Sequence, residues 1–401
     1  MQFRMRFSKT FSQNFLLLII SIVISILLVE WAVGKIFFTP AAASIALEEG
    51  VNFDTRSRLE VVLDCRKSDK SCYPVVPPHT FLTNKLEVTG EGIVPLSGVA
   101  RARIIACNEG GFYSTYTTDE FGFRNPAGIW RNTDVVDLAF VGDSYTQGDC
   151  VNDGDHFVDH FRPMFPKVLN LGAGGNGPLL ELASVKEYLE GKQVRYLFWI
   201  YFERNDFSDL KNRKQSPVLL QYLEPGFSQS LMSRHKEINE ALRIYIDNRL
   251  KMKEQGRAKV LPNLRLLLWK LRHDKLPTAY SENKGSSDVA DYDIELFEQV
   301  LEETKRIITG SGGKLVFVYF PEYERFSENT PSPPWSAARI KPDIIDMVSA
   351  LGIDVIDIEP AFHREDDPLE LFPFRIQGHY NSKGYAVVAN EIKRYLDDHQ
   401  I

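Results

Sequence analysis

The chain has 401 residues, of which 44% are hydrophobic and 25% are charged, a balance typical of a globular protein. This length can hold one large domain with additional segments. The formal net charge is −7 and no basic stripe runs along the sequence, so a nucleic-acid partner is not expected.

The N-terminal segment predicts a membrane anchor. Residues 15–34 form an apolar run interrupted mainly by Ser21, Ser25 and Glu30, and a helix of about 20 such residues spans a bilayer. Basic residues precede the run and acidic residues follow it, which places residues 1–14 in the cytoplasm. We therefore expect a single-pass protein of the inner (cytoplasmic) membrane with its remaining residues in the periplasm. A cleaved signal peptide is the alternative, because small residues at 41–43 offer a cleavage site.

A small lead-in region is expected at residues 39–133, where several prolines interrupt helices and short runs suit strands. An oxidising compartment favours disulfides, and the spacing suggests a local Cys65–Cys72 bond and a long-range Cys107–Cys150 bond. Other pairings, or four free thiols, are alternatives. A zinc site is less favoured, because no Cys-x-x-Cys spacing occurs.

From residue 134 to residue 401, predicted strands and helices alternate, which indicates a three-layer α/β/α domain with a parallel, flavodoxin-like sheet. The predicted strands are 135–141, 167–171, 196–202, 314–320 and 354–358. The predicted helices are 155–164, 179–189, 294–309, 337–350 and 383–397.

Residues 210–291 interrupt this alternation as an insertion. Apolar clusters there suggest two amphipathic helices joined around Pro262, with basic residues between them. A helical subdomain packed on the sheet is the favoured interpretation. Contact with a membrane surface or a partner, or a lid above an active site, is the alternative.

Two segments suggest a serine nucleophile and its base. Ser144 lies in Gly142-Asp143-Ser144-Tyr145-Thr146, a glycine-containing turn directly after the predicted strand 135–141. A helix beginning there would direct unpaired N–H groups toward a developing oxyanion. A serine hydroxyl needs a base within hydrogen-bond reach, and His379 in Gly378-His379-Tyr380-Asn381 is the candidate.

Two further segments follow predicted strands at the same edge of the sheet. Gly175 lies five residues after Asn170, in a glycine-rich loop that follows the predicted strand 167–171. Asn205 follows the strand 196–202, and Arg204 beside it introduces a positive charge near the substrate. Any backbone amide in the glycine-rich loop could point inward, so the loop is better defined by the sequence than the individual donor.

In this order, the four segments resemble the blocks of the SGNH (GDSL-type) hydrolase family, over roughly residues 135–396 with an insertion. The resemblance implies a nucleophilic Ser144, a His379 base, and an oxyanion hole formed by Gly175, Asn205 and the Ser144 amide.

The sequence departs from the family at the residue that orients the histidine. The family places an aspartate three residues before the histidine, where this chain has Ile376. The site could be a dyad, or another group could orient the ring. The candidates are a backbone carbonyl, Asp366, Asp367, Glu370 and Gln377.

These features predict an extracytoplasmic serine esterase or O-acyltransferase that acts on acyl esters of envelope glycans, within the machinery that handles envelope polysaccharide. No motif decides whether water or a sugar captures the acyl group. The alternative is a catalytically degenerate SGNH-fold glycan-binding or scaffold module, suggested by the missing aspartate. No cofactor or metal is expected: His156 and His160 lack the glutamate of a zinc-protease motif, and the glycine string at 172–177 lacks an acidic ribose partner.

Overall fold

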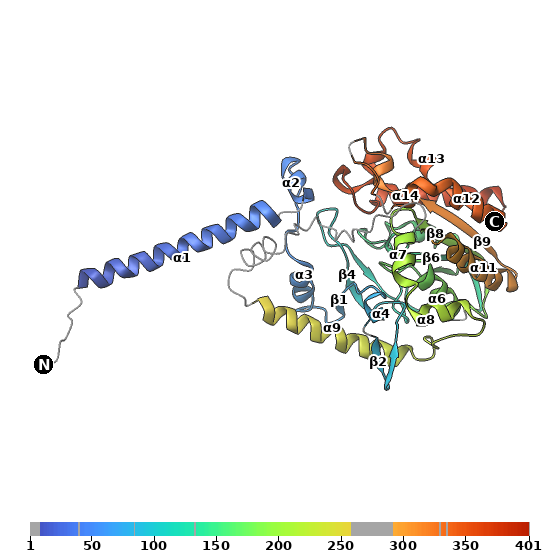
Figure 1. The fold of residues 1–401 in the computed structure, drawn as a ribbon, viewed down its shortest axis with the longest axis horizontal. Helices are drawn as coiled ribbons and strands as arrows, with labels where there is room; N and C mark the ends of the chain where they lie inside the picture. Colours follow the sequence, from blue (N-terminus) through green and yellow to red (C-terminus); the bar gives the residue numbers. More distant parts are fainter. Residues whose placement is uncertain are drawn as a thin grey trace.

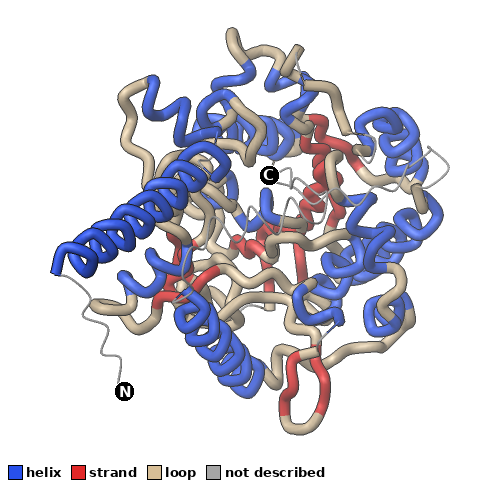
Figure 2. Tube along the Cα trace, turned by 60° about the vertical axis from the view of Figure 1, so that its left-hand side comes forward, coloured by secondary structure: helices blue, strands red, loops and turns tan. Residues whose placement is uncertain are grey.

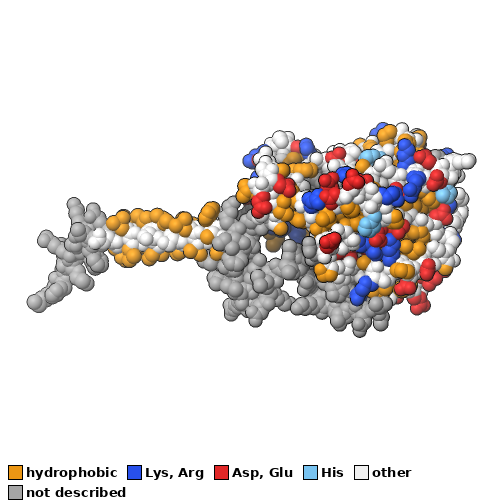
Figure 3. Space-filling model, turned by 90° about the horizontal axis from the view of Figure 1, so that it is seen from above, with side chains coloured by type: hydrophobic (Ala, Val, Ile, Leu, Met, Phe, Trp, Pro, Cys, Tyr) orange, Lys and Arg blue, Asp and Glu red, His pale blue; other side chains and the backbone are white. Residues whose placement is uncertain are grey.

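The computed structural model describes residues 9–38, 41–83, 85–131, 134–257, 292–328, 330–333 and 336–400. Helix α1 (Lys9–Phe38) projects away from the rest of the molecule (Figure 1). Its segment Asn14–Val33 has a mean hydropathy of 2.8 and, among these residues, is the one stretch long and apolar enough to cross a membrane. Hydrophobic side chains cover its surface (Figure 3). A membrane anchor and a signal sequence share these properties, so α1 fits both interpretations.

The lead-in region consists of short elements that share a hydrophobic core with the α/β domain. For example, Ile104 and Tyr116 belong to the same buried cluster as Val136 of the central sheet. The helices are α2 (Ala41–Glu48), α3 (Arg58–Cys65) and α4 (Thr80–Thr83). Strands β1 (Cys72–Pro74), β4 (Arg103–Ile105) and β5 (Thr115–Thr117) form one sheet, and β2 (Leu86–Val88) and β3 (Glu91–Ile93) form another. The Cys65–Cys72 and Cys107–Cys150 disulfides are both present.

The central sheet confirms the predicted fold class. Its strands are β6 (Val135–Val141), β7 (Val168–Asn170), β8 (Gln193–Phe202), β9 (Lys314–Phe320) and β10 (Asp354–Asp357). Their order is β10-β9-β8-β6-β7, and every neighbouring pair is parallel. This is the flavodoxin-like order, in which the first strand lies between the second and the third.

Side chains alternate between the two faces of this sheet, and helices bury both faces (Figure 2). In β8, Trp199 and Tyr201 join one hydrophobic cluster, whereas Phe198 and Ile200 join the other. The first face is covered by α6 (Pro178–Tyr188), α11 (Ile294–Gly310) and α12 (Lys341–Ala350). The second is covered by α14 (Ser382–Asp398), α13 (Glu359–Phe362) and the 3₁₀ helix η1 (Phe157–His160).

Two predicted helices are shorter than expected, and prolines explain both differences. The helix expected at 155–164 is only the 3₁₀ turn η1, because Pro163 disfavours a helical conformation in the residue before it. The helix expected at 337–350 is divided into η5 (Ala337–Ile340) and α12, with Pro342 in the first turn of α12. Further 3₁₀ turns are η4 (Tyr323–Arg325), η6 (Pro368–Leu371) and η7 (Pro373–Arg375).

The insertion begins with α7 (Asp206–Arg213), α8 (Pro217–Leu220) and η2 (Gln221–Leu223), followed by the long helix α9 (His235–Arg257). Helix α9 packs on the lead-in region: the Asn239 side chain accepts from the Ala100 N–H at 2.9 Å, and Arg243 donates to the Ala100 carbonyl. The second helix expected around Pro262 lies outside the described residues.

Candidate active site

The predicted site residues lie at the carboxyl edge of the sheet, where the strand order reverses. Strand β6 has β7 on one side and β8 on the other. In open parallel sheets, ligands bind at such switch points, because the two loops diverge and leave a crevice. Ser144 follows β6 and Asn205 follows β8, so both side chains lie at this crevice.

The nucleophile turn is built from a short helix between two glycines. Helix α5 (Ser144–Gln147) begins at Ser144, and the Asp143 side chain caps it by accepting from the Tyr145 N–H at 2.8 Å. A Cβ atom on Gly142 would lie 2.1 Å from Thr146 Oγ1, so a side chain would not fit there. Gly148 ends the helix with a φ of 81°, in the left-handed region that glycine adopts readily. The local sequence therefore fixes the position of Ser144.

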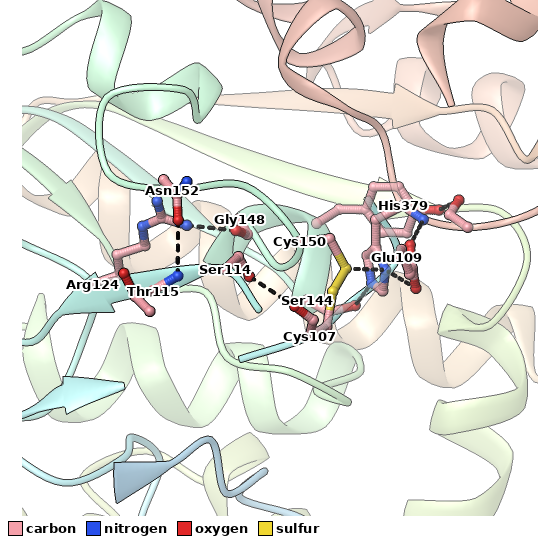
Figure 4. Close-up of a disulfide and its surroundings, with 12 residues drawn as sticks. Cys107, Glu109, Ser114, Thr115, Arg124, Ser144, Gly148, Cys150, Asn152 and His379 are labelled. Carbon is pink, nitrogen blue, oxygen red and sulfur yellow. Dashed lines mark hydrogen bonds and ion pairs between the residues drawn. A yellow bond between two sulfur atoms is a disulfide. The ribbon is translucent and has the colours of Figure 1, made fainter. Parts of the chain in front are cut away.

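A chain of hydrogen bonds joins Ser144, His379 and a residue that the sequence did not suggest, Glu109 (Figure 4). His379 Nε2 lies 2.9 Å from Ser144 Oγ, and His379 Nδ1 lies 3.0 Å from Glu109 Oε1. The His379 backbone N–H also donates to Glu109 Oε2 at 2.6 Å. Glu109 comes from the loop between β4 and β5 of the lead-in region. It therefore occupies the place of the acid in a nucleophile–base–acid triad.

Three of the orienting groups expected from the sequence are engaged elsewhere. Asp367 forms an ion pair with Arg375, and Glu370 contacts Lys383 at 3.1 Å. The Gln377 side chain donates to Glu324 at 2.6 Å. Sequence reasoning missed Glu109 because it is 270 residues from His379. The available signal was the expected Cys107–Cys150 bond, since it brings residue 109 close to the nucleophile segment.

Gly378 provides the space that Glu109 occupies. A Cβ atom at this position would lie 2.6 Å from Glu109 Oε2, closer than any normal contact. Tyr145 also donates a hydrogen bond to the Gly378 carbonyl, which holds the backbone beside the nucleophile turn.

The Gly378→Ala variant is therefore expected to displace the Glu109 carboxylate while the protein remains folded. We expect kcat to fall by about 10- to 100-fold, because the carboxylate that orients the histidine is displaced but still present. Steady-state kinetics on a small acyl ester, together with the thermal unfolding midpoint, would measure both effects. Unchanged kcat would show that Glu109 is not needed in this position.

Electrostatic interactions favour the protonated form of His379. Burial lowers the pKa of His379, but Glu109, with Asp149 and Asp143 further away, outweighs this and raises it to about 9. Burial raises the pKa of Glu109, yet the charge and hydrogen bonds of His379 bring it below its usual range. An imidazolium at His379 is thus stabilised by the carboxylate beside it.

The structure brings Asn205, but not Gly175, to the lining of the same pocket as Ser144. Asn205 Nδ2 donates to Asp209 at 3.1 Å and to Asp143 at 3.3 Å. Gly175 has a φ of 68° and is not among the residues that line the pocket. Its carbonyl accepts from Arg213, and its loop carries the N–H of Gly174, which donates to Gln147 at 2.8 Å.

Behind Asn205, several buried carboxyl groups have raised pKa values. Burial raises the pKa of Asp209 to about 7, and burial also raises the pKa values of Asp143, Glu181 and Asp206. Burial thus disfavours the charged form of each of these acids.

The pocket at Ser144 has a volume of about 330 Å³ and combines polar and aromatic walls. Its lining includes Arg204, Glu324, Gln377, Phe202 and Tyr323. Arg204 lies at the pocket as expected, but its positive charge is paired with Glu324 and, at 3.7 Å, with Glu322. Arg204 therefore orders this wall of the pocket.

One group of possible metal ligands occurs in the described part of the chain. Ligand atoms of Cys107, Glu109 and Cys150 lie within 4.8 Å of one another. The two cysteines are bonded to each other, however, so neither offers the thiolate that a metal ion would need.

No family model matches this chain, and no curated protein matches it. Solved structures with a similar fold include a lipase/acylhydrolase from Enterococcus faecalis, with 13% identity, a TM-score of 0.36, and coverage of 66% of this chain and 96% of that one. An acetyl xylan esterase has 11% identity and a TM-score of 0.38, with coverage of 65% and 100%. A two-domain esterase active on acetylated mannans has 13% identity and a TM-score of 0.33, with coverage of 66% and 49%.

Proposed function

We propose that the protein is a serine esterase or O-acyltransferase of SGNH type, and that Ser144, His379 and Glu109 form its catalytic triad. The observation that carries the proposal is the continuous Ser144–His379–Glu109 hydrogen-bond chain, with distances of 2.9 and 3.0 Å, at the switch point of the sheet. A nucleophile, a base and an acid joined in this order are the groups that catalyse acyl transfer. Such a triad is recognised by its geometry and not by the positions of its residues in the sequence.

In the proposed first step, Ser144 Oγ attacks the acyl carbonyl carbon while His379 Nε2 accepts the hydroxyl proton. The Glu109 carboxylate faces His379 Nδ1 and stabilises the imidazolium that forms. The proposed oxyanion donors are the Ser144 N–H, the Gly175 N–H and the Asn205 side chain, which would exchange its 3.3 Å contact with Asp143 for the oxyanion. Collapse of the tetrahedral intermediate breaks the ester bond, and His379 returns the proton to the departing alcohol.

In the second step, His379 accepts a proton from water or from an acceptor hydroxyl, and that oxygen attacks the acyl group on Ser144. The bond from the acyl group to Ser144 Oγ then breaks, and His379 returns the proton to that oxygen. Water yields a carboxylic acid, whereas a sugar hydroxyl yields a new ester. The polar and aromatic walls around Arg204, Glu324 and Tyr323 suit a hydroxyl-rich substrate, which supports an acylated glycan. The apolar α1 supports placement at the outer face of the inner membrane, in the periplasm.

The alternative of a catalytically degenerate glycan-binding module rested on Ile376, which replaces the family's aspartate. Because Glu109 faces His379 Nδ1 at 3.0 Å, the site does not lack an acid, and that reason no longer applies.

Covalent labelling tests the nucleophile directly. A fluorophosphonate probe is expected to label the wild-type protein and to fail on the Ser144→Ala variant, because a probe of this kind reacts only with an activated serine hydroxyl. Ser349→Ala, at an exposed position in the last turn of α12, is the matched control and should label like the wild type. Equal labelling of wild type and Ser144→Ala would refute the proposed nucleophile.

A second experiment separates the esterase from the transferase. The protein is incubated with an acetyl ester, with and without oligosaccharide acceptors, and the products are followed by mass spectrometry. Acetyl-sugar that requires Ser144 identifies a transferase, and acetate release unchanged by acceptors identifies an esterase. If a folded protein that labels at Ser144 forms neither product, acetyl esters of these sugars are not the substrates.

A further inference from the structure

The Cys107–Cys150 disulfide connects the two parts of the chain that supply the proposed triad. Cys107 lies two residues before Glu109, and Cys150 lies six residues after Ser144. We propose that this disulfide is a positioning element of the active site, which holds Glu109 against His379, so that full activity requires the oxidised pair. The inference rests on the proposed function, because it assigns a role to the disulfide in the same triad.

The disulfide lies against the triad itself (Figure 4). Cys150 Sγ is 3.4 Å from His379 Nδ1, the nitrogen that also faces Glu109 at 3.0 Å. The two sulfur atoms and a Glu109 carboxylate oxygen lie within 4.8 Å of one another. A change at the sulfur atoms is therefore a change in the immediate surroundings of the His379–Glu109 contact.

The loop that carries Glu109 has few connections toward the nucleophile segment. Its base is closed by the Ser114 N–H, which donates to the Cys107 carbonyl at 2.9 Å. Its other side is tied to the lead-in region, where the Asn108 side chain donates to the Asp54 carbonyl and the Asp54 N–H donates to the Gly111 carbonyl. The covalent bond between the Glu109 loop and the loop after α5 is the Cys107–Cys150 disulfide.

The second cysteine is held in an unusual backbone conformation. Cys150 has a φ of 71°, in the left-handed region that residues with a side chain seldom adopt. The disulfide fixes Cys150 in this position beside His379. Once the bond is broken, this conformation has no covalent constraint, and both the Cys150 segment and the Glu109 loop can relax.

Reduction by a dithiol breaks the S–S bond with two electrons and two protons and gives two thiols. The Cys150 thiol would then lie at His379 Nδ1, where it competes with Glu109 as a hydrogen-bond partner. An orienting carboxylate must remain within a few tenths of an ångström to fix the imidazole tautomer. The expected consequence is a slower chemical step and a lower pKa of His379, and not merely a less stable protein.

The two disulfides of this chain provide a matched comparison. The Cys107→Ala/Cys150→Ala variant is expected to lose about 10- to 100-fold in kcat on a small ester, with little change in KM. Its pH profile should shift to lower pH, because the imidazolium loses part of its carboxylate stabilisation. The Cys65→Ala/Cys72→Ala variant removes the other disulfide, which joins α3 to β1. It should retain the wild-type kcat and pH profile even if its thermal midpoint falls.

A combined variant tests whether the disulfide acts through Glu109. In a Glu109→Gln background, removal of Cys107 and Cys150 should cost little further activity, since the group that the disulfide positions is already absent. Losses that multiply independently would overturn the inference. Wild-type kcat and pH profile in the folded cysteine variant would also overturn it.

Reduction of the folded wild-type protein covers the case in which the cysteine variant does not fold. Dithiothreitol is titrated in the presence of a chelator, so that reduced thiols do not capture zinc. Alkylation and mass spectrometry report each disulfide, and near-ultraviolet circular dichroism reports the fold. Activity should fall as Cys107–Cys150 is reduced and recover on reoxidation. Full activity after complete reduction of this pair would refute the positioning role.

Labelling at Ser144 distinguishes the two possible failures. If the fluorophosphonate does not label Ser144 in the oxidised wild type, the proposed function itself is wrong. If Ser144 labels at the same rate with the Cys107–Cys150 pair oxidised, reduced or replaced, the function stands and only the positioning role of the disulfide is rejected.

Discussion

Replacement of His379 by alanine is expected to lower kcat for an acyl ester by roughly 10⁶-fold, because loss of either the nucleophile or the base disables the whole triad. The imidazole is 2.9 Å from Ser144 Oγ, and no other histidine lines the pocket among the described residues. Without it, the serine hydroxyl must give its proton to water, and a neutral hydroxyl is a weak nucleophile.

The control for this variant is His363→Ala. His363 is exposed, contacts Glu359 at 3.5 Å and lies far in sequence from the nucleophile turn. Steady-state kinetics and the rate of fluorophosphonate labelling should both decrease for His379→Ala and remain unchanged for His363→Ala. A His379→Ala variant that labels at the wild-type rate would show that another group activates Ser144.

The Glu109→Gln variant is expected to lose about 10³- to 10⁴-fold in kcat, as in other triads where an amide replaces the acid. An amide can donate to His379 Nδ1, which favours the tautomer with its proton on Nε2, and that nitrogen then cannot accept the Ser144 proton. Glu302→Gln, at an exposed position of α11, is the matched control.

The pH dependence of kcat/KM gives an independent readout of the same pair. In the wild type, activity should rise with pH and level off above an apparent pKa of about 9, because His379 must lose its proton to act as a base. The Glu109→Gln variant lacks the carboxylate that raises the His379 pKa, so its rise should occur at lower pH, with a lower plateau. Identical midpoints in both proteins would contradict the Glu109–His379 coupling.

The same coupling affects stability. Below about pH 6.5, the usual histidine pKa, His379 carries a proton in both the folded and the unfolded chain, and the pair contributes its full stabilisation. As the pH rises through about 9, the folded imidazolium loses its proton and this contribution disappears. The difference in thermal midpoint between wild type and Glu109→Gln should therefore shrink across this range.

Local patterns in the sequence were sufficient for the fold class. Apolar strands alternating with amphipathic helices specify a parallel sheet buried on both faces, because each face must be covered by helices. The same patterns failed where proline intervened, since Pro163 and Pro342 changed the local backbone without changing the apolar spacing.

The positions of Ser144, Asn205 and His379 are local properties of turns that leave the sheet or precede its last helix, so each could be proposed from a short motif. The place of Glu109 is not local. It depends on the pairing of β4 with β5, the space above Gly378 and the bond from Cys107 to Cys150. A contact across 270 residues leaves no periodic or motif signal, because only the folded chain brings these atoms together. The sequence alone thus determined the sheet and the nucleophile turn, whereas the tertiary structure decided which acid faces the histidine.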